Sequence, residues 1–179
     1  NLLMKLLVAV SRIAKMPMDD VSRLGVSNWI RSMLYFEHRK INALIPKNSE
    51  LRTKGDSNTE AMIKGKKYKG GLVVEPKSGV FFDITVLDFA SLYPSIIKVH
   101  NLSYETVRCS HNECKTNLIT ETNHWVCKKQ RGITSLIIGS LRDLRVNYYK
   151  RISGADSLST EDQNLYTVVA QALKVILNA

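Results

Sequence analysis

The segment DFASLYPSII, residues 88–97, sets a single carboxylate at the end of an apolar run. Alternating side chains predict a strand over residues 80–89, in which Asp88 shares one face with Phe82 and Ile84. A carboxylate held at a strand end suits Mg²⁺, which proteins bind through one or two carboxylates together with substrate phosphate oxygens. By itself, however, the pattern is more typical of an Asp that ends a strand or caps a helix.

Cationic side chains recur on two helices that are predicted near the C-terminal end. Arg142 and Arg145 stand three residues apart, and Lys174 and Asn178 stand four apart, so each pair shares a helix face. Cations across a helical hairpin suit a triphosphate, because Arg gives bidentate hydrogen bonds to phosphate oxygens. Two solvated helix faces would carry the same pattern.

The segment KGKKYKGG, residues 64–71, interleaves basic residues with Tyr68 and ends in Gly70 and Gly71. Gly allows a close approach of the backbone, and a Tyr among cations suits stacking on a base beside a phosphate backbone. An exposed loop that enters a strand is the alternative, and the motif alone is a weak signal.

Three cysteines, Cys109, Cys114 and Cys127, lie within one short region that also contains His111 and His124. Their odd number argues against a simple disulfide framework. A zinc site usually shows a CxxC pair, and none is present. Free thiols, a local disulfide and a zinc site all stay open, with zinc the least favoured.

The elements that must position these residues belong to an α/β (α+β) class. Composition is that of a globular protein, and 26 Lys and Arg against 16 Asp and Glu give a net charge of +10, which favours a polyanionic partner. No apolar run approaches the ~20 residues of a membrane span. The missing initiator Met suggests a piece of a longer protein.

The elements predicted in order are helices over 2–16 and 28–41, a polar linker over 46–66, β segments over 72–75 and 80–89, a short helix to about 99 with Pro94 in its first turn, an irregular region over 100–130, and an antiparallel pair of helices over 134–151 and from Ser159 or Thr160 onward.

Taken in order, these motifs resemble those of family B DNA polymerases, most closely the archaeal replicative type. DFASLYPSII matches every fixed position of that family's motif A, D-x-x-S-L-Y-P-S-I-I. LKVILNA is similar to the start of its motif B, YKGG to the Y-x-G-G element that joins the exonuclease and polymerase regions, and RGITSLIIGSLRDLR to its first fingers helix. The resemblance implies helices and a linker after the exonuclease region (1–63), a partial palm sheet with a cysteine-bearing connector (64–130), and a helical-hairpin fingers subdomain (131–179).

The resemblance also implies a function, template-directed addition of dNTPs to a primer 3′-end by two-metal nucleotidyl transfer in DNA replication. The implied partners are primer–template DNA, dNTPs, the remaining polymerase regions and a sliding clamp, in the cytoplasm at the nucleoid. The implied cofactor is Mg²⁺, with Asp88 as the catalytic carboxylate. The implied site residues are Asp88 and the carbonyl of Phe89 for metal; Ser91, Leu92, Tyr93, Arg145, Lys174 and Asn178 for nucleotide; and Tyr68, Gly70 and Gly71 for DNA.

The sequence departs from the family pattern in two places that matter. A Lys often follows the fingers Arg by four residues, but here that position is Tyr149, and Lys150 lies about 140° round a regular helix. Either Lys150 reaches the nucleotide from a distorted helix, or the chain relies on Arg145 and Lys174, and we expect the second. The Asp-Thr-Asp turn that supplies the second metal carboxylate is absent, so we expect this chain alone to be inactive. The alternative function is a polymerase-like scaffold that binds DNA without synthesis.

The cysteine region resembles the place where some archaeal relatives carry a disulfide. Cys127 lies five residues before Gly132, as the second cysteine does in those relatives. Its partner would be Cys114 or Cys109.

Overall fold

The computed structural model describes residues 2–52, 60–63, 66–69, 75–119, 122, 124–155 and 157–178. The backbone divides into two compact units, one made of Asn1–Pro46 and Ala90–Ala179 and the other of Lys47–Phe89. The first unit is helical and contains most of the residues discussed below.

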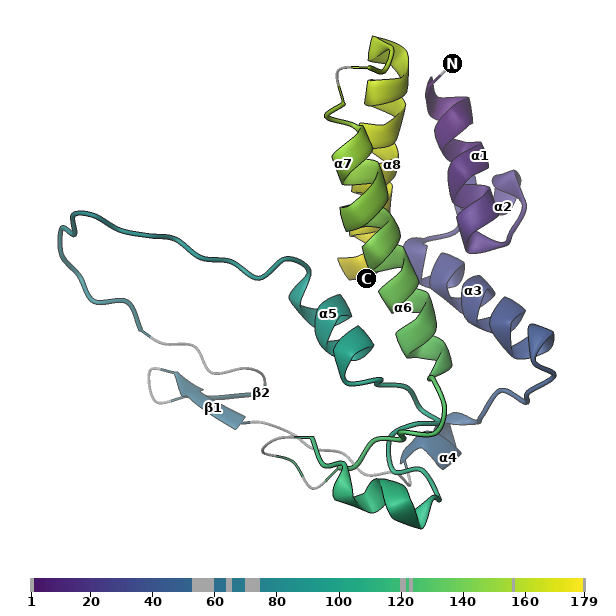
Figure 1. The fold of residues 1–179 in the computed structure, drawn as a ribbon, viewed down its shortest axis with the longest axis vertical. Coiled ribbons are helices and arrows are strands. Elements are labelled where there is room, and N and C mark those ends of the chain that lie inside the picture. Colours follow the sequence, from purple (N-terminus) through teal and green to yellow (C-terminus); the bar gives the residue numbers. More distant parts are fainter. Residues whose placement is uncertain are drawn as a thin grey trace. The chain divides into compact units, whose positions relative to one another are not determined.

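Three helices open the helical unit: α1 (Leu2–Ala14), α2 (Met18–Arg23) and α3 (Val26–Lys40). The two helices predicted in this region are confirmed, since α1 ends before Pro17, which stands at the N-cap of α2. Val10, Ala14 and Val21 are buried where α1 meets α2. Figure 1 shows the three helices in purple and blue.

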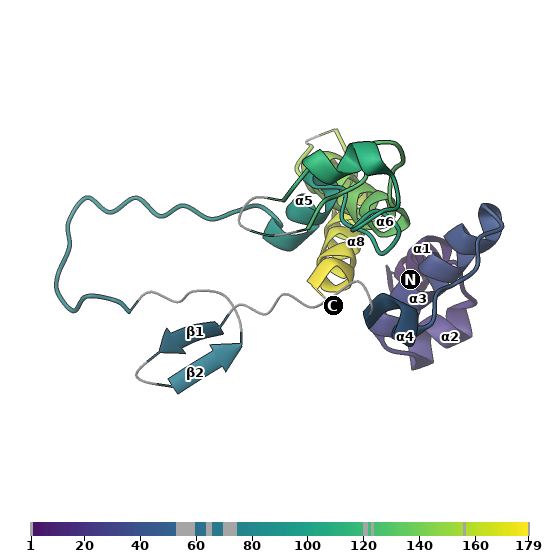
Figure 2. The ribbon, with the colours of Figure 1, turned by 90° about the horizontal axis from the view of Figure 1, so that it is seen from below.

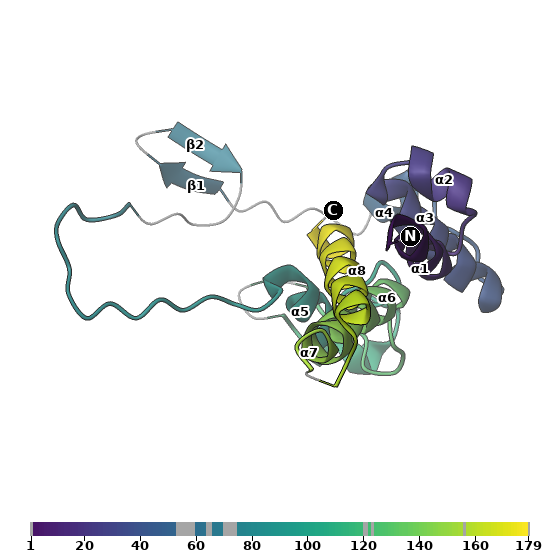
Figure 3. The same ribbon diagram turned by 90° about the horizontal axis from the view of Figure 1, so that it is seen from above.

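The predicted helical hairpin is confirmed at the C-terminal end. Its first arm is continuous through α6 (Ile133–Asp143), the π-helical segment η2 (Leu144–Tyr149) and α7 (Lys150–Ile152), and its second arm is α8 (Thr160–Asn178). The Ser159 hydroxyl accepts a hydrogen bond from the Asp162 N–H (3.2 Å) and donates one to the Asp162 carboxylate (2.7 Å), which caps α8. Figures 1 and 3 show the two arms side by side.

The main core lies between this hairpin and α3. Every third or fourth residue of each helix points inward, so a buried stripe forms on each of them. Leu173 is completely buried and makes the centre of the set. No helix among the described residues is long and apolar enough to cross a membrane. The buried members of this core are Met33, Ile133, Ile137, Leu141, Val169, Leu173 and Ile176.

The π-helical segment changes which aromatic residue faces inward. A regular helix through residue 151 would bury Tyr148, but Tyr148 is 47% exposed, and Tyr149 packs against the main core instead. The backbone gives the reason: the Lys150 N–H donates to the carbonyl of Arg145, a bond of the i→i+5 type that inserts one extra residue into the turn. Each residue after this turn therefore faces the direction that its predecessor would face in a regular helix.

A connector links α5 (Leu92–Val99) to α6 and contains the short 3₁₀ helix η1 (Asn112–Thr116). Asn101 fixes it to the start of α6. The Asn101 amide nitrogen donates to the carbonyls of Cys127 (3.1 Å) and Gln130 (2.9 Å), while its amide oxygen accepts from the Gly132 N–H (2.8 Å). The approach at Gly132 requires Gly, because a Cβ there would lie 2.4 Å from the Cβ of Ser103.

The second unit contains α4 (Asn48–Arg52) and a two-stranded antiparallel sheet of β1 (Glu60–Ile63) and β2 (Lys66–Lys69), in which Glu60 pairs with Lys69. Figure 2 shows the two arrows antiparallel to each other. The sequence predicted a linker here. The polar residues lack the alternation that marks a strand, so this hairpin was missed.

The predicted palm sheet is not confirmed. Residues 72–74 lie outside the described residues. Residues 80–89 form no strand, and Figure 2 shows them as a coil. A strand needs a neighbour for its N–H and C=O groups, and the described residues give this segment none. Its backbone is also interrupted at Asp83, whose φ of 53° lies in the left-handed region. The apolar side chains of the segment stay exposed, with Phe82 and Val86 both at 86%.

Candidate functional site

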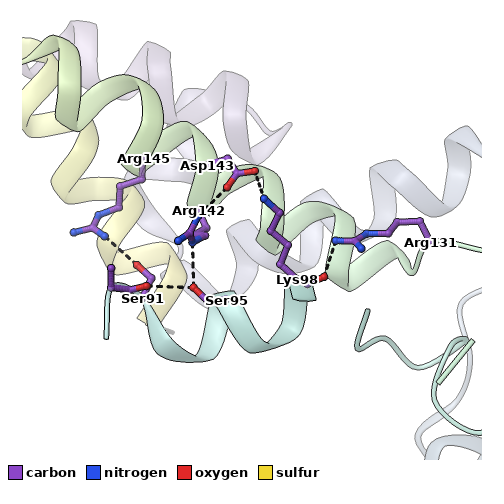
Figure 4. A network of polar contacts seen from close by, with 8 residues as sticks. Ser91, Ser95, Lys98, Arg131, Arg142, Asp143 and Arg145 are labelled. Carbon is purple, nitrogen blue, oxygen red and sulfur yellow. Dashed lines mark hydrogen bonds and ion pairs between the residues drawn. The ribbon is translucent and has the colours of Figure 1, made fainter. Parts of the chain in front are cut away.

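Ser91 occupies a strained turn at the start of α5. Its φ of 56° and ψ of 61° are left-handed, a conformation that costs a non-Gly residue about 1 kcal/mol or more. The Ser91 hydroxyl does not cap α5; it accepts a hydrogen bond from Nη1 of Arg145 at 3.1 Å. Figure 4 shows this contact between the turn and the first hairpin arm. The two residues are 54 apart in sequence and are brought together by the packing of α5 on α6.

Arg145 has a donor that the described protein atoms leave without a partner. Its Nε is buried and makes no hydrogen bond within the described residues, although Nη1 contacts Ser91. An unsatisfied buried donor costs about 1–3 kcal/mol, or more when it belongs to a charged group. A guanidinium in this state is suited to an anion with several oxygens.

A set of polar contacts beside Arg145 holds α5 against α6 (Figure 4). The Asp143 carboxylate accepts from Nζ of Lys98 at 2.5 Å and from Nη1 of Arg142 at 3.1 Å. Arg142 also donates through Nε to the Ser95 hydroxyl at 3.1 Å, and Arg131 donates to the Lys98 carbonyl at 2.8 Å. The cations of this set all have protein partners, and Arg145 differs from them in the one buried donor, Nε, that has none among the described residues.

The stem of Lys98 fits this position because α6 has a Gly opposite it. A Cβ at Gly139 would lie 2.9 Å from Cγ of Lys98, closer than real contacts allow. The hydrogen bond from Lys98 lowers the pKa of Asp143 below its ordinary value of 3.8, Arg142 lowers it further, and burial opposes both. Asp143 therefore stays ionised at neutral pH and keeps both contacts.

Replacing Asp143 with Asn is expected to reduce the free energy of unfolding by about 0.5–1 kcal/mol at neutral pH, since the ion pair is about one-third exposed. The folded-state pKa is lowered, so this contribution is present above the ordinary carboxyl pKa and is lost as the pH falls through the folded value. Urea unfolding followed by tryptophan fluorescence across the acid range measures it. The free energies of unfolding of the unmodified and Asp143→Asn proteins should become equal in acid.

Lys98→Met keeps the stem that packs on Gly139 and removes the charge, so it should reduce the same acid-dependent difference, leaving the part that Arg142 contributes. A double-mutant cycle then isolates the pair. An Asp143→Asn protein with the acid dependence of the unmodified chain would contradict the assignment.

The other predicted nucleotide residues are exposed. Leu92 and Tyr93 form the first turn of α5, and Tyr93 is 77% exposed. Lys174 and Asn178 lie on α8 with exposed side chains, and the described residues show no polar contact between either and Arg145. The structure therefore joins Ser91 with Arg145 directly and places the others on neighbouring helices of the same unit.

Asp88 and Phe89 belong to the other unit, and both side chains are exposed. The arrangement of Asp88 with respect to Ser91 and Arg145 thus stays a prediction. Tyr68 lies in β2, and its side chain, like Gly70 and Gly71, falls outside what the structure describes.

The π turn gives Tyr149 and Lys150 different surroundings. These are the residues at, and directly after, the position where the family often carries a Lys. Tyr149 is half-buried, lies 5.8 Å from the ring of Tyr166, and has a pKa raised by burial, with Tyr148 and Tyr166 adding to the effect. Lys150 is exposed and stands one π turn after Arg145. The expectation of a regular helix here is wrong. The angle of about 140° that separated Lys150 from the expected Lys position therefore does not apply.

Sequence reasoning missed the contacts of Ser95, Lys98 and Asp143. Lys98 and Asp143 are 45 residues apart, and no spacing rule connects them. The one usable signal was the adjacent Arg142 and Asp143 on a helix that carries other cations. Four residues that the sequence did not connect as a set, Cys109, His111, Cys114 and Cys127, also gather in the connector.

The fold and sequence comparisons agree on the class of protein. The structure resembles a solved family B DNA polymerase from Pyrobaculum calidifontis with a TM-score of 0.63, covering 98% of this chain and 22% of that one at 24% identity, which concerns the fold alone. The sequence profile described as DNA polymerase family B matches residues 16–179. The chain belongs to DNA polymerase family B.

Curated relatives are similar along the whole chain. DNA polymerase 1 of Sulfurisphaera ohwakuensis is 46% identical over 183 residues, which cover all of this chain and 21% of the relative. DNA polymerase 1 of Aeropyrum pernix is 44% identical over all of this chain and 19% of the relative, and that of Pyrococcus abyssi is 30% identical over 95% and 21%. The chain spans about a fifth of the length of these relatives.

Proposed function

We propose that this chain forms part of a template-directed DNA polymerase that adds dNTPs to a primer 3′-end and releases pyrophosphate. The observation that carries the proposal is Arg145, a half-buried guanidinium that contacts Ser91 and keeps one buried donor without a partner among the described residues. Family membership and the names of the curated relatives support the reaction class. Nucleotidyl transfer depends mainly on positioning and charge stabilisation, and this site supplies cations and backbone donors.

The triphosphate would lie between the start of α5 and the hairpin. Backbone N–H groups in a first helical turn have no intrahelical partners, so those of Ser91 and Leu92 are suited to phosphate oxygens. Arg145, Lys174 and Asn178 would approach from the hairpin, and Tyr93 would lie under the deoxyribose and exclude a 2′-hydroxyl by bulk. The high exposure of Tyr93 is consistent with a partner that lies outside the protein.

Lys150 joins this set in our proposal, in place of Tyr149. In the π turn its N–H bonds to the Arg145 carbonyl, so the two residues are separated by one turn of the helix. Tyr149 packs in the core and is not available for phosphate.

Asp88 and the carbonyl of Phe89 would hold a magnesium ion. An exposed carboxylate and a backbone carbonyl are oxygen donors of the kind that Mg²⁺ prefers, and one carboxylate is within its usual range when phosphate oxygens complete the shell. When bound, such ions stabilise charge on the attacking and leaving oxygens. The chain's own contribution is to place the carboxylate three residues before Ser91. The second carboxylate would come from polymerase regions outside this chain.

Tyr68, Gly70 and Gly71 would contact the template strand, next to the basic residues of KGKKYKGG. The boundaries 1–63, 64–130 and 131–179 for the post-exonuclease helices, partial palm and fingers remain our proposal. Primer–template DNA, the other polymerase regions and a sliding clamp are the proposed partners.

Primer extension tests the function directly. The full-length protein that carries this chain, given magnesium, primer–template and all four dNTPs, is expected to extend the primer. The 179-residue chain, assayed alone, is expected to give no product because one metal carboxylate is missing. Extension by the chain alone would contradict the two-carboxylate requirement. A full-length protein that binds DNA but does not extend it would instead identify a scaffold.

A further inference from the structure

Four side chains with metal-binding atoms converge in the connector between α5 and α6. The sulfurs of Cys109, Cys114 and Cys127 and a ring nitrogen of His111 all lie within 4.8 Å of one another. Nδ1 of His111 is 3.4 Å from the sulfur of Cys127. All three cysteines are buried, Cys114 to within 1% exposure, and all are free thiols. They are thus close together without a covalent bond between them.

We propose that these four residues bind one structural Zn²⁺ ion in a tetrahedral Cys₃His site. Zinc lies about 2.3 Å from a Cys sulfur and about 2.0–2.1 Å from a His nitrogen, so tetrahedral ligands stand roughly 3.5–3.8 Å apart. The mutual distances in the cluster are all 4.8 Å or less, at most about 1 Å longer than that spacing. The four residues have the spacing Cys-x-His-x₂-Cys-x₁₂-Cys. Two residues separate His111 from Cys114, the same gap as in a CxxC pair, with His in place of the first Cys.

A backbone N–H group beside the cluster supports a metal-bound thiolate. The Lys128 N–H donates to the Cys114 sulfur at 3.4 Å. The sulfur of Cys127 lies within hydrogen-bond distance of the His111 ring. Hydrogen bonds from outside the ligand shell orient metal ligands and stabilise their charge. The sulfur of Cys114 therefore already has a backbone donor of the kind that supports a bound thiolate.

The connector has little else to stabilise it. Its local core consists of the three cysteines with Trp125 packed against them. Its only strand-like pairs among the described residues are two isolated bridges, Val107 with Val126 and Leu118 with Trp125. Small segments with few apolar contacts commonly depend on a metal or a disulfide for their fold. A zinc ion would supply that stability here.

The arrangement favours zinc over the two other chemistries of such thiols. A disulfide would use two sulfurs and leave the third buried thiol and His111 without a role. An iron–sulfur cluster holds its ligands on several metal atoms and would spread them farther than the 4.8 Å seen here. A single tetrahedral ion uses all four residues.

The position of the site also gives it a consequence for the rest of the helical unit. The carbonyl of Cys127 accepts from the Asn101 amide, which also accepts from the Gly132 N–H at the start of α6. The zinc would therefore fix the end of the connector from which α6 and Arg145 continue. This role does not depend on the proposed polymerase reaction.

Metal analysis of the full-length protein, purified under reducing conditions without chelator, tests the proposal. We expect close to one zinc per chain attributable to this site. Cys114→Ser is expected to weaken zinc affinity by more than about 100-fold, as measured against a chelating indicator. His100→Ala, a change at an exposed histidine at the end of α5, is the matched control and should keep the zinc.

Two further measurements keep the test decisive if Cys114→Ser fails to fold. Cobalt substituted into the unmodified protein should give the visible bands and thiolate charge transfer of tetrahedral sulfur ligation. Cys114→His keeps a zinc ligand and should bind zinc more strongly than Cys114→Ser does. Iron in place of zinc, a disulfide found by mass spectrometry after alkylation, or a cobalt spectrum without thiolate bands would each overturn the proposal.

Discussion

Replacing Asp88 with Asn is expected to lower primer extension by the full-length protein about a thousandfold or more, with little change in its affinity for primer–template DNA. The reason is the proposed role of the carboxylate in holding magnesium, whose stabilisation of charge in nucleotidyl transfer is worth several kcal/mol. A loss of about 4 kcal/mol corresponds to that factor in rate. Single-turnover incorporation of one dNTP measures it.

Asp83→Asn is the matched control, because Asp83 lies in the same exposed segment and has the same charge. It should extend primers at close to the rate of the unmodified protein. DNA binding by both variants, measured by fluorescence anisotropy, separates a catalytic loss from a general one. Equal losses in the two variants, or normal incorporation by Asp88→Asn, would contradict the assignment of Asp88 to the metal.

Replacing Arg145 with Ala is expected to lower kcat/KM for a correctly paired dNTP by about 100-fold. A charge-assisted hydrogen bond contributes about 1.5–3 kcal/mol, and Arg145 would give at least one to the triphosphate. The change also removes the donor that contacts the strained Ser91 turn. Arg145→Lys keeps the charge without the planar pair of donors and should show an intermediate loss.

Arg151→Ala is the control for Arg145, since Arg151 is an exposed cation on α7 of the same hairpin arm. Its kcat/KM should change by less than about threefold, as expected for an exposed charge. If Arg145→Ala kept normal kcat/KM while its thermal stability fell, Arg145 would serve to hold the Ser91 turn and not to bind nucleotide.

The longer helices were predictable from sequence because each buries one stripe, and the period of that stripe is local information, whereas the short α2 and α4 were not predicted. Leu2–Ala14, Val26–Lys40 and the hairpin were all found in this way. The segment 80–89 was not, because a strand depends on pairing with a neighbour, and that neighbour can lie far away in the chain or outside it. The β1–β2 hairpin was missed for the opposite reason, since its polar residues hide a local pairing.

The candidate site was predictable in its parts and not in its contacts. Ser91 and Arg145 were named from motifs, but their hydrogen bond depends on the packing of α5 on α6. The hydrogen-bonded ion pair between Lys98 and Asp143 depends on the same packing. The cysteine cluster shows a different limit: His111 was noted beside the cysteines, but zinc was the least favoured option because the search was for a CxxC pair, and His111 has the spacing that the first cysteine of such a pair would have.

The π turn between α6 and α7 also affects how this chain is compared with its relatives. One extra residue in a turn rotates everything that follows by about 100° relative to a regular helix. Counting residues from Arg145 then pairs Tyr149 with a position that faces elsewhere in a protein without the extra residue. Where a relative has a regular helix at this point, residues that are equivalent in space differ by one in the residue count beyond Arg145, and aligning the two helices takes a single-residue gap.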